Sequence, residues 1–123
     1  MAATRILLVE DERNLSELLV HILLSAGFAV DLAATVAEAE RRLAQPSDYG
    51  LVITDWRLPD GDGAALADRV AGLGINTAIL TGYAFHMSVE VAARHEVWMK
   101  PMRPVELIAA IEHCMAKDEC GNN

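Results

Sequence analysis

Short apolar runs alternate with segments of helical periodicity along most of the chain. The runs rich in apolar and β-branched residues, which predict buried strands, are residues 6–9, 28–32, 51–54, 77–80 and 96–99. Between the first two runs, apolar residues recur at helical spacing, namely Leu15, Leu18, Leu19, Ile22 and Leu23. The pattern predicts about five strands and five helices, and therefore an α/β fold with a parallel sheet covered by helices on both faces.

Signals at the ends of the segments mark where the helices begin and end. Two predicted starts carry a capping side chain with a carboxylate three residues later, Asn14 with Glu17 and Thr35 with Glu38. Gly27 predicts a left-handed stop after the first helix. The third helix is expected from about Ala64, a weak fourth helix within residues 85–94, and a last helix opened by Pro104.

Composition limits the classes of protein that the chain can represent. With 123 residues and 53% hydrophobic residues, it can form one domain with one core, predicted over residues 1–116, followed by a disordered polar tail over 117–123. Cys114 and Cys120 form no C-x-x-C or metal-ligand pattern, and the N-terminal apolar run is too short for a signal peptide or membrane span. These features predict a cytoplasmic protein without a membrane partner. The formal net charge of -8 argues against a nucleic-acid partner.

Functional side chains follow the predicted strands where each strand ends. Because the carboxyl ends of parallel strands meet at one edge, we expect these side chains to converge, and they are Glu10, Asp11, Asp55, Thr81 and Lys100. Two carboxylates about 4 Å apart repel by roughly 4 kcal/mol at an effective dielectric constant of ~20, so three of them need compensating cations. Lys100 supplies one charge. An oxygen-only ligand set favours Mg²⁺, or Mn²⁺ in its place, for the rest.

A hard divalent cation, an ammonium group and a hydroxyl group around one carboxylate suit a phosphoryl group. Asp55 is therefore predicted to be the nucleophile that forms an acyl phosphate. Taken singly, the same residues have plainer explanations, as acids of solvated loops, a β-branched strand end and a surface lysine. The segment after Asp55 contains Pro59, Gly61 and Gly63, which predict a loop, and His95 is interpreted as the exposed end of a helix.

Four separated segments, "ILLVEDE", "LVITDWRLPDGDG", "AILTGYA" and "MKPMRP", resemble the receiver domain of two-component response regulators, in the expected order over nearly the whole chain. The resemblance implies a flavodoxin-like (CheY-like), doubly wound fold with five parallel strands in the order 2-1-3-4-5. It also implies a phosphoacceptor signalling domain with slow self-dephosphorylation rather than an enzyme.

The resemblance implies specific roles for the residues at the sheet edge. Asp55 would be the phosphoacceptor, and Mg²⁺ would be bound by Glu10, Asp11, Asp55 and the backbone carbonyl of Arg57. Thr81 and Lys100 would contact the phosphoryl oxygens, and the peptide bond between Lys100 and Pro101 would be cis.

The sequence departs from the family pattern in the region that the family uses as its switch. Val97 stands where an aromatic residue is expected, and Trp98 points to the other face by strand alternation. The stretch between Thr81 and Lys100 looks about three residues short, which predicts a short, shifted or mobile fourth helix. The "TGYA" segment resembles the Thr-Gly-Tyr subgroup, which is common among stand-alone receivers and receivers attached to hybrid kinases. One hypothesis makes Tyr83 the partner of Thr81 in switching, and its rival makes Tyr83 a loop aromatic that covers the core.

Partners and other functions follow from the resemblance as expectations. The phosphodonor would be a histidine kinase or a histidine phosphotransfer protein that docks on the first helix, and the downstream protein target is unknown. A degenerate receiver that acts as a phosphorylation-independent interaction module, and a receiver excised from a hybrid histidine kinase, stay open as alternatives. A haloacid-type phosphatase is disfavoured because Arg57 occupies the place of its second acid.

Overall fold

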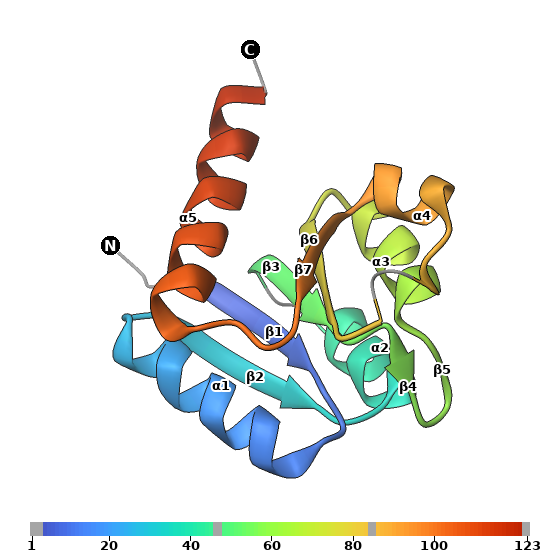
Figure 1. The fold of residues 1–123 in the computed structure, drawn as a ribbon, viewed down its shortest axis with the longest axis horizontal. Coiled ribbons are helices and arrows are strands. Elements are labelled where there is room, and N and C mark those ends of the chain that lie inside the picture. Colours follow the sequence, from blue (N-terminus) through green and yellow to red (C-terminus); the bar gives the residue numbers. More distant parts are fainter. Residues whose placement is uncertain (1–3, 46–47, 84–85, 122–123) are drawn as a thin grey trace.

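The computed structural model describes residues 4–45, 48–83 and 86–121, and its centre is a five-stranded parallel sheet (Figure 1). The sheet strands are β1 (Arg5–Val9), β2 (Ala29–Ala33), β3 (Tyr49–Thr54), β6 (Asn76–Thr81) and β7 (Glu96–Met99). Their order across the sheet is β2-β1-β3-β6-β7. Counted as five strands along the chain, this is the predicted order 2-1-3-4-5.

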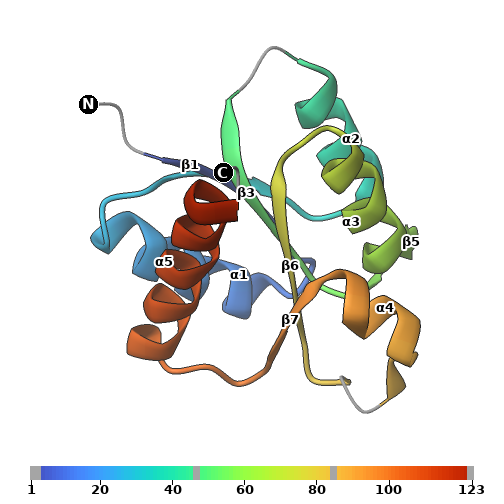
Figure 2. The same ribbon diagram turned by 90° about the horizontal axis from the view of Figure 1, so that it is seen from above.

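Helices cover both faces of the sheet, as the alternating pattern predicts. On one face lie α1 (Arg13–Ser25) and α5 (Pro104–Gly121), and on the other lie α2 (Val36–Ala44), α3 (Gly63–Gly72) and α4 (Val89–Arg94) (Figure 2). Successive residues of a strand point to opposite faces. Ile6 and Leu8 of β1 therefore belong to the core under α1 and α5, whereas Leu7 and Val9 belong to the core under α2 and α3.

The helix ends agree with the sequence signals in part. The hydroxyl group of Thr35 accepts a hydrogen bond from a backbone amide three residues later and caps α2, and Gly27 has a φ of 97° after α1, so both predictions are confirmed. The predicted cap at Asn14 is wrong. Glu12 caps α1 instead, and its carboxylate accepts hydrogen bonds from the amide of Asn14 at 3.1 Å and of the next residue at 2.6 Å.

Three segments differ from, or refine, the prediction. The predicted loop after β3 contains a short antiparallel hairpin, formed by β4 (Arg57–Leu58) and β5 (Gly61–Asp62). α4 has six residues, so the prediction of a short fourth helix is confirmed. α5 continues to Gly121, so residues 117–121 are helical where a disordered tail was expected, and residues 122–123 lie outside the described residues. None of the helices among the described residues is long and apolar enough to cross a membrane.

Candidate functional site

Asp55 follows β3 directly and lies at the carboxyl edge of the sheet. Its backbone amide donates to the carbonyl of Val9 at 2.9 Å, so the β1–β3 pairing extends to this residue. Its side chain is 14% exposed, and Oδ1 accepts a hydrogen bond from the amide of Trp56 at 2.7 Å. The hydroxyl group of Thr54 donates to the Asp55 carbonyl at 2.8 Å. These contacts fix the carboxylate while leaving part of it accessible.

Gly63 closes the segment that follows Asp55, and the site depends on its lack of a side chain. Its amide donates to the carbonyl of Trp56 at 2.6 Å, which returns the chain to the end of β3 as α3 begins. A Cβ atom at Gly63 would clash with the carbonyl oxygen of Asp55. Sequence reasoning treated Gly63 as loop punctuation, because nothing local to it indicates the contact with Asp55.

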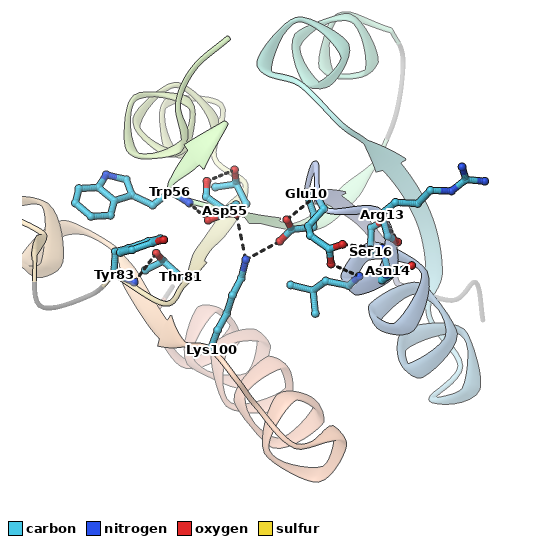
Figure 3. Close-up of polar contacts among 12 residues, drawn as sticks. Glu10, Arg13, Asn14, Ser16, Asp55, Trp56, Thr81, Tyr83 and Lys100 are labelled. Carbon is cyan, nitrogen blue, oxygen red and sulfur yellow. Dashed lines mark hydrogen bonds and ion pairs between the residues drawn. The ribbon is translucent and has the colours of Figure 1, made fainter. Parts of the chain in front are cut away.

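The predicted acids and the predicted lysine come together at this edge (Figure 3). Lys100 Nζ donates to Glu10 Oε1 at 2.9 Å and to Asp55 Oδ2 at 3.1 Å, so the ammonium group bridges two carboxylates from different strands. One carboxylate oxygen from each of Glu10, Asp11 and Asp55 lies within 4.8 Å of the others. The arrangement offers clustered oxygen donors of the kind that Mg²⁺ prefers.

Burial and charge set the protonation of this cluster. Burial of the Glu10 carboxylate, whose side chain is only 2% exposed, raises its pKa, and the hydrogen bond from Lys100 offsets this only in part. Burial alone would lower the pKa of Lys100, but its hydrogen bonds to Glu10 and Asp55 outweigh that effect and raise it. The ammonium group therefore stays charged. Because one ammonium faces three acids, a divalent cation fits the charge of the site.

Thr81 ends β6 beside the cluster, and its side chain is buried. Its hydroxyl oxygen accepts a hydrogen bond from the amide of Tyr83 at 3.0 Å, and its carbonyl accepts one from the amide of Lys100 at 3.0 Å. The peptide bond between Lys100 and Pro101 is cis, the isomer that the resemblance implied. Thr81 thus joins the segment that carries Tyr83 to the strand that delivers Lys100.

Arg57 lies between two aromatic rings next to the acceptor, a feature that sequence reasoning missed. Its Cζ atom is 5.1 Å from the centroid of the Trp56 ring and 4.9 Å from that of Tyr83. Both distances are within the range of cation–π attraction. Tyr83 is 52% exposed, and its ring has a second neighbour in the ring of His86, at 6.3 Å between centroids. The stack connects the segment after β3 to the segment after β6.

His95 is not the exposed helix end that the sequence suggested, so that prediction is wrong. Its side chain is only 3% exposed, and it contacts Asp68 of α3 and Thr77 of β6. Thr77 lies near the amino end of β6, at the opposite end of the strand from Thr81. His95 therefore takes no part in the carboxylate cluster.

The fold agrees with what known proteins show. Residues 6–112 match the family model described as response regulator receiver domain. The chain therefore belongs to the response regulator receiver domain family, whose general function is signalling through phosphorylation.

Curated relatives are similar to the chain over most of its length. The transcriptional regulatory protein CusR of Escherichia coli (strain K12) is 35% identical over 113 residues, which cover 87% of this chain and 49% of CusR. The response regulator receiver protein CpdR of Brucella abortus (strain 2308) is 32% identical over 113 residues, which cover 88% of this chain and 93% of CpdR. The chain spans half or less of the length of several curated relatives that it matches, CusR among them.

Solved structures of receivers superpose closely on this chain. A CheY-like receiver domain protein from Methanospirillum hungatei JF-1 has a TM-score of 0.86 and 27% identity, covering 98% of this chain and 99% of that chain. The response regulator TrrA from Thermotoga maritima, solved in complex with Mg²⁺-BeF, has a TM-score of 0.82 and 28% identity, covering 90% of this chain and 98% of that chain.

Proposed function

We propose that Asp55 accepts a phosphoryl group from a phosphohistidine of a histidine kinase or histidine phosphotransfer protein, in a reaction that requires Mg²⁺ or, in its place, Mn²⁺. The observation that carries the proposal is the cluster at the sheet edge. Lys100 bridges Asp55 and Glu10, and the carboxylate of Asp11 lies beside them. Burial raises the pKa of Glu10 while the paired Lys100 stays charged, and such perturbed groups gathered at one edge are typical of functional sites.

The acid cluster fits a bound divalent cation. Glu10, Asp11 and Asp55 would hold the ion through carboxylate oxygens, and the backbone carbonyl of Arg57 would add a further ligand. When bound, the ion would neutralise charge on the phosphoryl oxygens and allow the phosphodonor to approach the acids. The relative TrrA, solved with Mg²⁺-BeF, supports this choice of ion.

The residues of the chain then have distinct roles in the transfer. A carboxylate oxygen of Asp55 forms the new O–P bond, while the P–N bond of the phosphohistidine breaks and its electron pair returns to the imidazole ring. Lys100, already 3.1 Å from Asp55 Oδ2, neutralises charge on a phosphoryl oxygen. The hydroxyl oxygen of Thr81 accepts a hydrogen bond from the Tyr83 amide. The hydroxyl hydrogen could then be donated to a second phosphoryl oxygen.

Signalling would follow through protein contacts that depend on phosphorylation. Movement of Thr81 toward the phosphoryl group would pull on the Tyr83 amide, and the Tyr83 ring would leave its stack on Arg57. Leu18 of α1 is 54% exposed and offers an apolar docking position for the phosphodonor. The downstream target is a protein of unknown identity. We propose no nucleic-acid or membrane partner, and action in the cytoplasm stays a prediction.

Intact mass spectrometry tests the proposal. We would incubate the protein with Mg²⁺ and either acetyl phosphate or phosphoramidate, whose P–N bond resembles that of phosphohistidine. We expect a gain of one phosphoryl group in the wild type, no gain in Asp55→Asn, and no gain when a chelator removes Mg²⁺. Asp48→Asn is the matched control, because Asp48 is 93% exposed and lies outside the carboxylate cluster. A folded wild-type protein that gains no mass from either donor would overturn the proposal.

A further inference from the structure

The short helix α4 is held by little apolar packing. None of its six residues, all of which the structure describes, is buried. A helix of this length is not stable alone, so its neighbours must hold it in place. Met87, just before the helix, and Val91 within it pack against the small core formed by Ala64, Ala67 and Ile79. This apolar contact stabilises the first part of α4, so its C-terminal end must be held by other interactions.

The C-terminal end of α4 meets a carboxylate on α3. Asp68 accepts hydrogen bonds from Arg94 Nε and Nη2, both at 3.3 Å, one on each carboxylate oxygen. His95, the residue that caps α4, places Nε2 2.7 Å from Asp68 Oδ1. Two consecutive residues at the end of one helix therefore converge on a single side chain of another. The paired contact with Arg94 adds directional specificity to the attraction.

His95 also ties this cluster to the sheet. Its Nδ1 is 3.3 Å from the hydroxyl oxygen of Thr77 in β6, and its side chain is 3% exposed. A neutral ring with its hydrogen on Nε2 donates to Asp68 and accepts from the Thr77 hydroxyl group, whereas a protonated ring donates to both. Both forms keep the contact with Asp68. Such a buried polar ring needs these partners, because burial without them is costly.

We propose that Asp68 is a positioning residue that anchors the C-terminal end of α4 to α3 and, through His95, to β6. The N-terminal end of α4, which follows the segment of Thr81 and Tyr83 along the chain, is then the end that moves. The hydrogen bond from His95, and after it that from Arg94, lowers the pKa of Asp68. The anchoring carboxylate therefore stays ionised at a lower pH than an ordinary aspartate would. The role in switching rests on the proposed function, whereas the anchor itself does not.

Hydrogen exchange of the unphosphorylated protein tests the anchor. Asp68→Ala removes the carboxylate without weakening α3, because alanine is the best helix former. We expect amide exchange in residues 91–95 to become about fivefold faster, since a charge-assisted hydrogen-bond cluster is lost. Asp68→Glu, which restores a carboxylate, should return most of the protection. Glu40→Ala is the matched control, because Glu40 forms a similarly half-exposed pair with Arg69 between α2 and α3.

Unchanged exchange in residues 91–95 of Asp68→Ala, or an equal increase in Glu40→Ala, would overturn the anchor. The same measurement after treatment with acetyl phosphate and Mg²⁺ tests the moving end, with intact mass confirming the modification. In the phosphorylated wild type we expect exchange to change in residues 86–90 and to stay constant in 92–95. An equal change at both ends would contradict the inference. Absence of a mass gain would contradict the proposed function and leave the result on the anchor standing.

Discussion

Replacing Lys100 with methionine would test the electrostatic balance of the site. The variant Lys100→Met keeps most of the side-chain stem and removes the ammonium group that lies 2.9 Å from Glu10 and 3.1 Å from Asp55. At an effective dielectric constant of ~20, each of these contacts represents about 5 kcal/mol of Coulomb attraction, much of which the burial of the charges offsets. Lys100 is 22% exposed, so solvent screens the remainder further.

We expect Lys100→Met to lower the free energy of unfolding by about 2 kcal/mol, below the 3–5 kcal/mol typical of fully buried pairs. For a chain of 123 residues this corresponds to a fall of about 8 °C in Tm. Urea denaturation followed by circular dichroism, at neutral pH and without Mg²⁺, measures the loss. Adding Mg²⁺ should stabilise the variant more than the wild type, because the acids then lack their own cation.

A double-mutant cycle shows whether this loss comes from the carboxylates. In the background of Glu10→Gln, the substitution Lys100→Met should cost about half as much, because one of the two charged partners is gone. A loss below about 0.5 kcal/mol, or an equal loss in both backgrounds, would refute the bridging role of the ammonium group.

Three other predictions concern the same part of the molecule. Gly63→Ala should cost about 3 kcal/mol or more in urea denaturation, because its Cβ meets the backbone of Asp55, whereas Gly72→Ala, which meets no atom within 4 Å, should cost little. Because the pKa of Glu10 is raised in the folded state, that state binds the proton more tightly than the unfolded chain. Without Mg²⁺, the free energy of unfolding from urea denaturation should therefore rise as the pH falls from neutral toward 4.5, the ordinary pKa of a glutamate. Saturating Mg²⁺ should abolish this gain. Tyr83→Ala should remove the change in amide hydrogen exchange that phosphorylation causes in residues 86–90, whereas Tyr83→Phe, which keeps the ring, should retain it. If both variants behaved like the wild type, Tyr83 would be a loop aromatic without a role in switching.

The residues of the sheet edge could be predicted because their placement follows from topology. Parallel strands end at a common edge, so Glu10, Asp55 and Lys100 had to approach one another whatever the details of the loops. The helix start after β1 could not be settled in this way. The amide of Glu12 donates to Glu10 Oε2 at 3.1 Å, and Glu12 rather than Asn14 caps the N-terminus of α1. Local capping rules do not contain that contact.

Features that depend on distant partners escaped prediction. His95 is buried and contacts Asp68 and Thr77, which are 27 and 18 residues away in sequence, and nothing next to it indicates either contact. The stack of Arg57 on Tyr83 likewise joins two loops, and its geometry depends on where both loops leave the sheet. Periodicity and strand-end chemistry therefore predict the frame of the site, while side-chain contacts between separate segments need the structure.

The hydrogen bond between Lys100 and Glu10 joins residues that are 90 positions apart, and β7, which delivers the lysine, is an edge strand. Contacts of such long sequence separation are slow to form in folding, because much of the chain must be ordered first. In a chain whose last strand has not yet paired with β6, the ammonium group would be missing from the acids. Under the proposed function, competence for phosphoryl transfer would then arise only when folding is complete, and partly folded chains would not respond to the phosphodonor.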